Sequence, residues 1–218
     1  MIEYAAKYKD KFGEEKTKVY SDGTTMHLVL RGIKFEGSDF EMLEGKVDDK
    51  KFEYEKYQES CLGDLTNFEL EIDFPIIIIW NNDPVIGNLN ASIVTGKESN
   101  VFLELKTKFG KFQNTKNCGW FEDALVEIQK MLPQKAQIKT CLSCKYSSYH
   151  PVGSGMFGGL SCFKNLRLEA DNICNKDDLM ILWEKGCREK TIFNVQEVFD
   201  CSEHQFITKN DWTYKDWT

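Results

Sequence analysis

The sequence predicts an α+β fold with an antiparallel β-sheet or sandwich in its N-terminal half, one amphipathic helix, and a zinc-ribbon-like C-terminal segment. Three patterns carry this prediction. Residues 68–74 alternate apolar and acidic side chains, as a half-buried strand does. Residues 120–132 repeat apolar side chains at intervals of three and four, as an amphipathic helix does. Cys141 and Cys144 form a Cys-x2-Cys pair, which is typical of zinc sites.

The first half of the chain is predicted to be a sheet whose strands follow one another along the sequence. Residues 68–74 place apolar side chains on one face and carboxylates on the other, so one face of this strand meets water. Shorter segments of similar character are bounded by glycine or polar turns: 25–30, 32–36, 89–94 and 101–108.

The apolar run after Pro75 is predicted to be a separate strand. Residues 76–80 read Ile-Ile-Ile-Ile-Trp, and a continuous run of this kind is typical of a strand covered on both faces. Pro75 would open this strand, since proline is tolerated at a first position. The turn-forming residues at 81–84 would end it.

Two helices are predicted in the second half of the chain. The first, at 120–132, has acidic residues in its first turn and ends before Pro133. The second begins after Asn175, which is a favourable N-cap residue, and stops at Gly186.

Composition indicates a soluble globular protein. The 218 residues are 41% hydrophobic and 29% charged, which is enough to bury one sizeable core. The N-terminus lacks an apolar signal region and the apolar run at 75–80 is too short to cross a bilayer, so we expect a cytoplasmic protein without a membrane partner. A net charge of −7 disfavours nucleic acid and favours a basic protein as partner.

A cysteine-rich segment is predicted to begin after Pro133. The chain then divides into a β-rich domain at 1–133 and a zinc-binding segment at 134–218, packed together as one compact unit. In a reducing cytosol the eight cysteines would remain thiols, which favours metal ligation over disulfides. Cys141 and Cys144 supply half of a tetrahedral site. Spacing alone leaves the other ligands open among five later residues: Cys162, Cys174, Cys187, Cys201 and His204.

The glycine-rich stretch at 146–159 has two interpretations. As a phosphate-binding loop it lacks both the Lys-Ser/Thr ending of a P-loop and a following helix. We therefore predict a hairpin that connects the Cys-x2-Cys pair to Cys162.

Several motifs in the second half occur in a fixed order: Trp120-Phe-Glu-Asp-Ala-Leu125, Cys141-x2-Cys144-Lys-Tyr-Ser147, Pro151-x-Gly153, Gly158-x-Leu160-x-Cys162-Phe163, Val195-Gln-Glu197 and Cys201-x-Glu203. This pattern, over roughly residues 68–206, resembles an uncharacterised bacterial family, a domain of unknown function with a four-cysteine zinc site. The resemblance implies a structural zinc held by four ligands: Cys141, Cys144, Cys162 and Cys201. His204 replaces an aromatic residue of that pattern, so His204 or Cys174 remains an alternative fourth ligand. The resemblance implies no activity.

The sequence shows no catalytic constellation, so a non-enzymatic role is favoured. Cys201 beside His204 would be a reactive thiol, but a metal-bound thiolate is not free to attack. A zinc-dependent hydrolase is one alternative; it would need an open coordination position, which His150 could occupy, and a carboxylate such as Glu197 or Glu203. A scaffold or adaptor subunit is another.

The favoured interpretation is a zinc-stabilised binding protein, in its sharpest form an immunity protein that neutralises a basic toxin domain. Its binding surface would be acidic and aromatic. The stretch at 39–44 and the acidic residues at 48–59, interleaved with Tyr54 and Tyr57, are predicted to form this solvated face.

Overall fold

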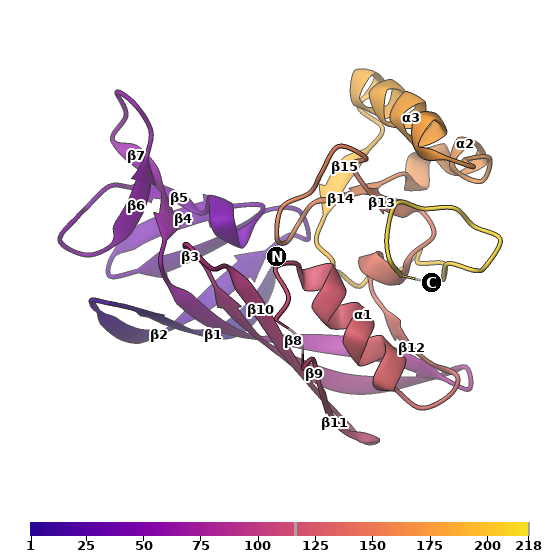
Figure 1. Cartoon of the computed structure of the whole chain (residues 1–218), viewed down its shortest axis with the longest axis horizontal. Coiled ribbons are helices and arrows are strands. Elements are labelled where there is room, and N and C mark those ends of the chain that lie inside the picture. Colours follow the sequence, from indigo (N-terminus) through magenta and orange to yellow (C-terminus); the bar gives the residue numbers. More distant parts are fainter. Residues whose placement is uncertain (116, 218) are drawn as a thin grey trace.

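The computed structural model describes residues 1–115 and 117–217 of the chain. Its largest element is a twelve-stranded antiparallel sheet that curls into a half-barrel (Figure 1). The strand order is β11-β10-β9-β8-β1-β2-β3-β4-β5-β7-β6, and β12 also pairs with β8. In chain order these strands are β1 (Ile2–Asp10), β2 (Gly13–Ser21), β3 (Met26–Leu30), β4 (Ile33–Gly37), β5 (Glu44–Lys46), β6 (Glu53–Lys56), β7 (Leu62–Thr66), β8 (Glu69–Trp80), β9 (Asp83–Val94), β10 (Asn100–Thr107), β11 (Gly110–Gln113) and β12 (Ala136–Lys139).

The predicted antiparallel sheet is confirmed, but the sequence pattern does not reveal its first two strands. In β2 only Val19 and Ser21 are buried, and the other side chains are charged or polar and at least partly exposed. A strand with so few buried positions lacks the apolar alternation on which the prediction depends. Its partner β1 buries Tyr4 and Tyr8.

Strand β8 runs unbroken through Pro75, so the prediction of a separate strand after this proline is wrong. On one edge β9 pairs with all of β8, whereas on the other edge β1 pairs only as far as Ile72 and β12 only from Ile77. Pro75 lies in the interval between them, where a missing N–H is tolerated. Ile78 is buried and Ile77 is partly exposed, so only one face of the run is fully covered.

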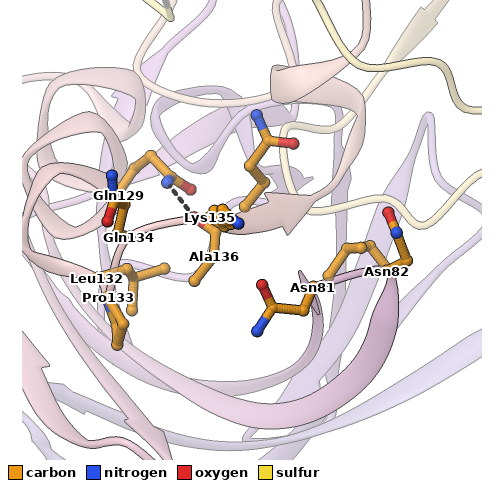
Figure 2. A pocket seen from close by; sticks show the side chains of 10 residues that line it. Asn81, Asn82, Gln129, Leu132, Pro133, Gln134, Lys135 and Ala136 are labelled. Atoms are coloured by element: carbon orange, nitrogen blue, oxygen red, sulfur yellow. Dashed lines mark hydrogen bonds between the residues drawn. The ribbon is translucent and has the colours of Figure 1, made fainter.

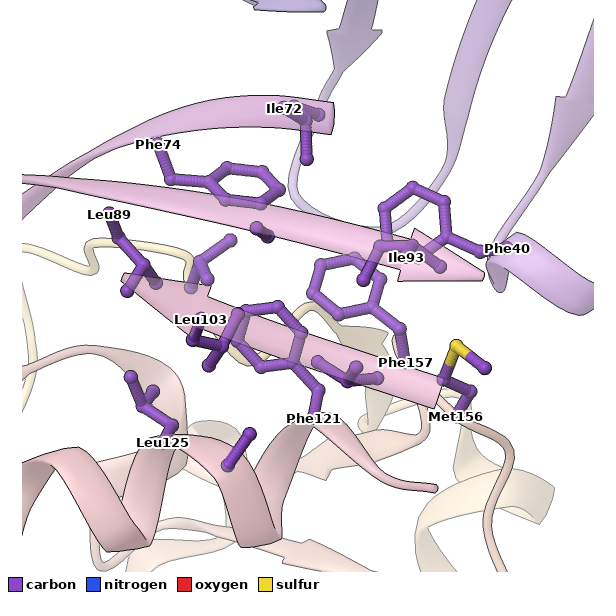
Figure 3. Packing of buried hydrophobic residues seen from close by; sticks show 14 of the residues in the cluster. Phe40, Ile72, Phe74, Leu89, Ile93, Leu103, Phe121, Leu125, Met156 and Phe157 are labelled. Atoms are coloured by element: carbon purple, nitrogen blue, oxygen red, sulfur yellow. The ribbon is translucent and has the colours of Figure 1, made fainter. Parts of the chain in front are cut away.

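The main core fills the space between the sheet and α1 (Phe121–Met131), the helix predicted at 120–132 (Figure 3). Phe74 from β8, Phe121 from α1 and Phe157 from the glycine-rich loop meet there. The rings of Phe121 and Phe157 are 5.0 Å apart, and those of Phe74 and Phe121 are 6.2 Å apart, both edge to face. Fully burying a side chain of this size stabilises the fold by about 1.5–3 kcal/mol. The glycine-rich loop is therefore part of the main core.

The C-terminal part adds a small sheet and two helices. Its elements are β13 (Ser147–Tyr149), β14 (Leu160–Cys162), β15 (Phe193–Val195), α2 (Arg167–Ala170) and α3 (Lys176–Glu189), together with two short 3-10 turns, η2 (Cys141–Ser143) and η3 (Lys164–Leu166). Another 3-10 turn, η1 (Phe40–Met42), lies between β4 and β5 of the large sheet. Strands β13 and β14 pair as a hairpin across the glycine-rich stretch, as predicted. Strand β12, just beyond the predicted boundary at Pro133, pairs with β8 and joins this part to the large sheet.

Helix α3 continues past Gly186, so the predicted stop at this glycine is wrong. A Cβ atom at Gly186 would lie 2.4 Å from Ile192, which means that glycine is needed here for close packing. The helix ends instead at Lys190, which has left-handed backbone angles. Its predicted N-cap is confirmed, because Asn175 accepts a hydrogen bond from the backbone of Asp178. No helix in the described ranges is both long enough and apolar enough to cross a membrane.

Candidate functional site

The cysteines that the resemblance implies come together from three segments: Cys141, Cys144, Cys162 and Cys201. The first two bracket η2, in which the N–H of Cys144 donates to the carbonyl of Cys141 (3.2 Å). Cys162 ends β14, opposite Ser147 of β13. The segment that carries Cys201 is tied to the turn, because the N–H of Cys141 donates to the carbonyl of Phe199 (2.9 Å).

The four thiols are close enough to affect one another's ionisation. Burial raises the pKa of Cys141 well above its usual range, and the charges of Cys144, Cys162 and Cys201 act in the same direction. Burial also raises the pKa of Cys162 to about 11, again with support from Cys144 and Cys201. A bound cation would reverse this effect, because a metal holds its thiol ligands deprotonated.

Two backbone N–H groups in the cluster point at sulfur atoms. The N–H of Glu203 donates to Cys201 Sγ (3.4 Å), and the N–H of Lys164 donates to the sulfur of Cys162. Each donor lies two residues after the cysteine it serves. Hydrogen bonds of this kind stabilise the charge of a metal-bound thiolate.

The thiols nevertheless do not stand at metal-ligand spacing. Across residues 1–115 and 117–217, no three His, Cys, Asp or Glu side chains are placed so that they could hold one metal ion. Zinc–sulfur bonds of about 2.3 Å require sulfur atoms about 3.8 Å apart, whereas charges affect a pKa over longer distances. The structure thus places the four thiols in one neighbourhood without closing a tetrahedral site.

A buried lysine stands beside the cysteines. Lys215 is 9% exposed, and its Nζ donates to the carbonyl of Cys144 (2.6 Å) and to Ser147 Oγ (2.9 Å). Burial lowers the pKa of Lys215 to about 8, while Cys144, Glu122 and Cys141 oppose this effect. Zinc bound by four thiolates carries excess negative charge, which a buried ammonium would offset. The charges of the four cysteines and Lys215 are therefore compatible with a bound zinc ion.

The four other metal-ligand candidates have different surroundings: His204, Cys174, His150 and Cys187, of which Cys187 is exposed on α3. His204 Nε2 lies 2.9 Å from Ser143 Oγ, and burial lowers the pKa of this imidazole to about 4. It therefore braces η2, which carries the Cys-x2-Cys pair. Cys174 is exposed in the segment before α3. His150 packs edge-on against Trp183, with their ring centres 4.4 Å apart.

The two carboxylates considered for hydrolysis are both held by the fold. Glu197 is wholly buried, and its oxygens accept hydrogen bonds from Tyr149 Oη (3.0 Å) and from the N–H of Gly158 (2.6 Å). Burial raises the pKa of Glu197 to about 7. Glu203 forms surface ion pairs with two cations, Lys164 and Arg167. Glu197 thus anchors the glycine-rich loop.

Asp39 holds the same loop from the side of the large sheet. It is 2% exposed and accepts hydrogen bonds from the N–H groups of Glu41 (3.2 Å), Met156 and Phe157. Burial raises the pKa of Asp39 to about 6. The prediction that residues 39–44 form a solvated face is therefore wrong at Asp39, because the loop covers it.

We expect the ionisation of Asp39 to weaken the fold as pH rises. The folded-state pKa of about 6 lies above the ordinary value of 3.8, so the stabilising contribution is complete below about pH 4 and is lost as pH rises through about 6. Asp39→Asn removes this loss. Between about pH 4 and 7 its free energy of unfolding, from urea titrations, should rise relative to wild type by about 3 kcal/mol. The exposed-site control Asp83→Asn should follow the wild-type profile. Parallel profiles for Asp39→Asn and wild type would refute the expectation.

A cavity of about 660 Å³ lies between the β8–β9 turn and the segment that joins α1 to β12 (Figure 2). Its wall is rich in side-chain amides: Asn81, Asn82, Gln129, Gln134 and Gln137. Gln129 donates to the carbonyl of Ala136 (2.8 Å) and accepts the N–H of Ile138 (2.8 Å), which fixes β12 in place. The lining residues include none of the clustered cysteines. The cavity is thus separate from the thiols.

Four carboxylates lie in register across the last strands of the large sheet, and we call them the acidic row: Glu36, Glu44, Asp64 and Glu55. They stand on β4, β5, β7 and β6, each directly opposite the next, and opposed residues of antiparallel strands share a face. Glu36 forms an ion pair with Lys34. The other three members form no ion pair with any described residue. Like charges directly opposite each other destabilise a sheet.

The acidic row ends at a small hollow. A cavity of about 260 Å³ is lined by Glu41 together with Glu55 and Asp64 of the row. Tyr57 lies at this end, 41% exposed, and its Oη donates to Asp64 (2.7 Å). The surface predicted for residues 48–59 is thus present in part. Tyr54, however, packs its ring against the core residues Phe35 and Phe52.

Sequence reasoning did not identify the acidic row or Lys215. The row depends on the register of four strands, which no spacing along the chain reveals. Lys215 lies 14 residues after the last predicted ligand, Cys201, in a segment without a motif. Glu122, whose charge acts on Lys215, belongs in contrast to the Trp120-Phe-Glu-Asp motif, which is recognisable from the sequence.

Comparison with known proteins gives a family and no activity. No curated protein and no solved structure matches the chain. A family model matches residues 2–147, which include Cys141 and Cys144 and stop short of Cys162 and Cys201. The matched range begins earlier and ends earlier than the resemblance at 68–206. It covers well over half of the chain, and the expectation of an uncharacterised family is confirmed: the protein belongs to a family of unknown function, DUF6304.

Proposed function

We propose that this chain is a non-enzymatic, cytoplasmic bacterial binding protein whose acidic row docks a basic protein, in its sharpest form a toxin domain that it neutralises. The observation that carries the proposal is the register of Glu44, Asp64 and Glu55, three carboxylates side by side that form no ion pair with a cation among the described residues. A basic partner would supply the missing cations. Complementary charge of this kind speeds association and selects the partner.

The neighbouring residues extend the row into a mixed acidic and aromatic surface. Glu36 stands opposite His27, whose ring stacks on Tyr20 with centres 5.1 Å apart. At the other end, Tyr57 and the hollow beside Glu41 would accommodate a projecting Lys or Arg side chain. Aromatic side chains add contact area, and carboxylates select a cationic group.

We propose that the chain binds one zinc ion and that this ion has a structural role. Cys141, Cys144, Cys162 and Cys201 would bind it, and Lys215 would offset the charge of the thiolates. When bound, zinc supplies a tetrahedral cross-link between η2, β14 and the segment before Cys201. These segments also hold Glu197 and the glycine-rich loop, so the cross-link would stabilise the core packing beneath the sheet.

Neutralising the acidic row should weaken binding and strengthen the fold. The triple variant Glu44→Gln, Asp64→Asn, Glu55→Gln removes the like-charge contacts, so its melting temperature should rise by roughly 1–3 °C. A Lys/Arg-rich peptide of about 20 residues should bind the wild type at low salt, and binding to the variant should be at least about tenfold weaker by calorimetry.

A matched control separates the row from net charge. Glu98→Gln, Glu184→Gln, Glu189→Gln neutralises three exposed carboxylates outside the row and should leave the affinity for the peptide near that of wild type. An equal loss of binding in both triple variants would mean that overall charge, and not the acidic row, attracts the peptide. That result would contradict the proposed docking surface.

A further inference from the structure

A cavity of about 460 Å³ opens between three segments that are far apart in the chain. The start of α1 contributes Trp120 and Glu122, the β13–β14 hairpin contributes Tyr149, and residues 213–216 close the third side. Two motifs in the first two segments, Trp120-Phe-Glu-Asp and Pro151-x-Gly153, are used by neither the zinc site nor the acidic row. The volume lies within the range of small-molecule sites, which is about 300–1,000 Å³.

The charged groups around this cavity favour a cation. Glu122 Oε1 accepts the N–H of Asp216 (2.8 Å), and Oε2 has no hydrogen bond with any described residue. Asp123 and Asp216 add two more carboxylates to the lining. Lys215 is also part of the wall. Its Nζ donates to Cys144 and Ser147, and it lies near enough to Glu122 for each of the two groups to affect the pKa of the other.

The aromatic groups favour an organic cation over a metal ion. Trp120 is 54% exposed at the start of α1, and Tyr149 and Tyr214 form other parts of the lining. The ring of Tyr214 already attracts an ammonium group, since Lys176 Nζ lies 4.3 Å from its centre. Aromatic faces beside carboxylates are the usual surroundings of an alkylammonium ion.

Thr213 adds an unused polar group. Its Oγ1 is buried and has no hydrogen-bond partner in the part of the chain that the structure describes. Buried hydroxyl groups normally have a partner. Thr213 lines the cavity with its other atoms, whereas Oγ1 lies beneath the cavity surface.

We propose that this cavity binds a small organic ammonium ion, with Glu122 as the counter-ion and Trp120 as the aromatic wall. The proposal is independent of the acidic row, because the two sites share no residue. Two sources share this chemistry: a free alkylammonium compound, or the side chain of a lysine in another protein.

Calorimetric titration with choline tests the site, and 3,3-dimethylbutanol serves as the uncharged probe of the same shape. Choline should bind the wild-type protein, and the alcohol should bind at least about tenfold more weakly. Glu122→Gln keeps an oxygen for the N–H of Asp216 and removes the charge, so it should weaken choline binding about tenfold or more. Trp120→Leu changes an exposed residue and should weaken it as well. Glu184→Gln on α3 is the control and should bind as wild type does.

The possible results are distinct. Equal binding of choline and the alcohol, or undiminished binding by a folded Glu122→Gln variant, would overturn the proposal. So would the absence of binding by both choline and a short peptide with one lysine. Binding of the peptide alone would uphold ammonium recognition and assign the source to a lysine side chain, whereas binding of choline would assign it to a free compound.

Discussion

Cys162→Ser should lower the free energy of unfolding by at least about 3 kcal/mol, because one missing thiolate opens a four-ligand zinc site. Structural zinc contributes about 10 kcal/mol or more to the folding of small zinc domains. Here most of the main core comes from the large sheet and α1, so part of the fold should survive. The small sheet and the glycine-rich loop should be lost first, since Cys162 ends β14. Urea unfolding followed by circular dichroism would measure the loss.

The matched control is Cys61→Ser. Cys61 is exposed between β6 and β7, and substitutions at such positions usually change stability by less than about 0.5 kcal/mol. Mass spectrometry of the intact wild-type protein should find one zinc per chain, and a chelator should lower its melting temperature but not that of Cys162→Ser. Equal losses of stability in Cys61→Ser, Cys141→Ser and Cys162→Ser would contradict the proposed zinc site. Wild-type protein that contains no metal would contradict it as well.

The elements with a buried apolar face were predictable from the sequence. Helix α1 has one strong apolar stripe, and β8 alternates without fault as far as Phe74. Beyond Phe74 the same strand was misjudged, because a run of isoleucines has no alternation and the proline suggests a boundary. Nothing along the chain shows that Pro75 falls between the two partners of β8, since this depends on where β1 ends and β12 begins.

The candidate sites divide in the same way. Cys141 and Cys144 are neighbours in sequence, so their shared turn was predictable. Asp39 was misjudged because its neighbours are acidic and the loop that buries it lies more than a hundred residues later in the chain. The acidic row and the partners of Lys215 likewise depend on contacts between distant segments. Local patterns identify residues with a chemical role, but the packing decides which of them meet.

Gly158→Ala should lower the free energy of unfolding by at least about 3 kcal/mol, which places it among the most destabilising single substitutions in the chain. Gly158 has a backbone φ of +75°, and a Cβ atom there would lie 2.0 Å from the carbonyl oxygen of Ser38. Backbone atoms cannot yield as a flexible side chain does, so the loop would have to move away from the sheet.

That movement would break contacts on both sides of the loop. The N–H of Gly158 donates to Glu197, and the preceding residue, Phe157, packs in the main core. Gly119→Ala is the control, because a Cβ atom there meets nothing within 4 Å and its φ is not in the left-handed region. Thermal and urea unfolding of the two variants would compare them directly. A Gly158→Ala variant as stable as Gly119→Ala would mean that the loop is not clamped between Ser38 and Glu197, and the joint role of Asp39 and Glu197 in holding it would fail as well.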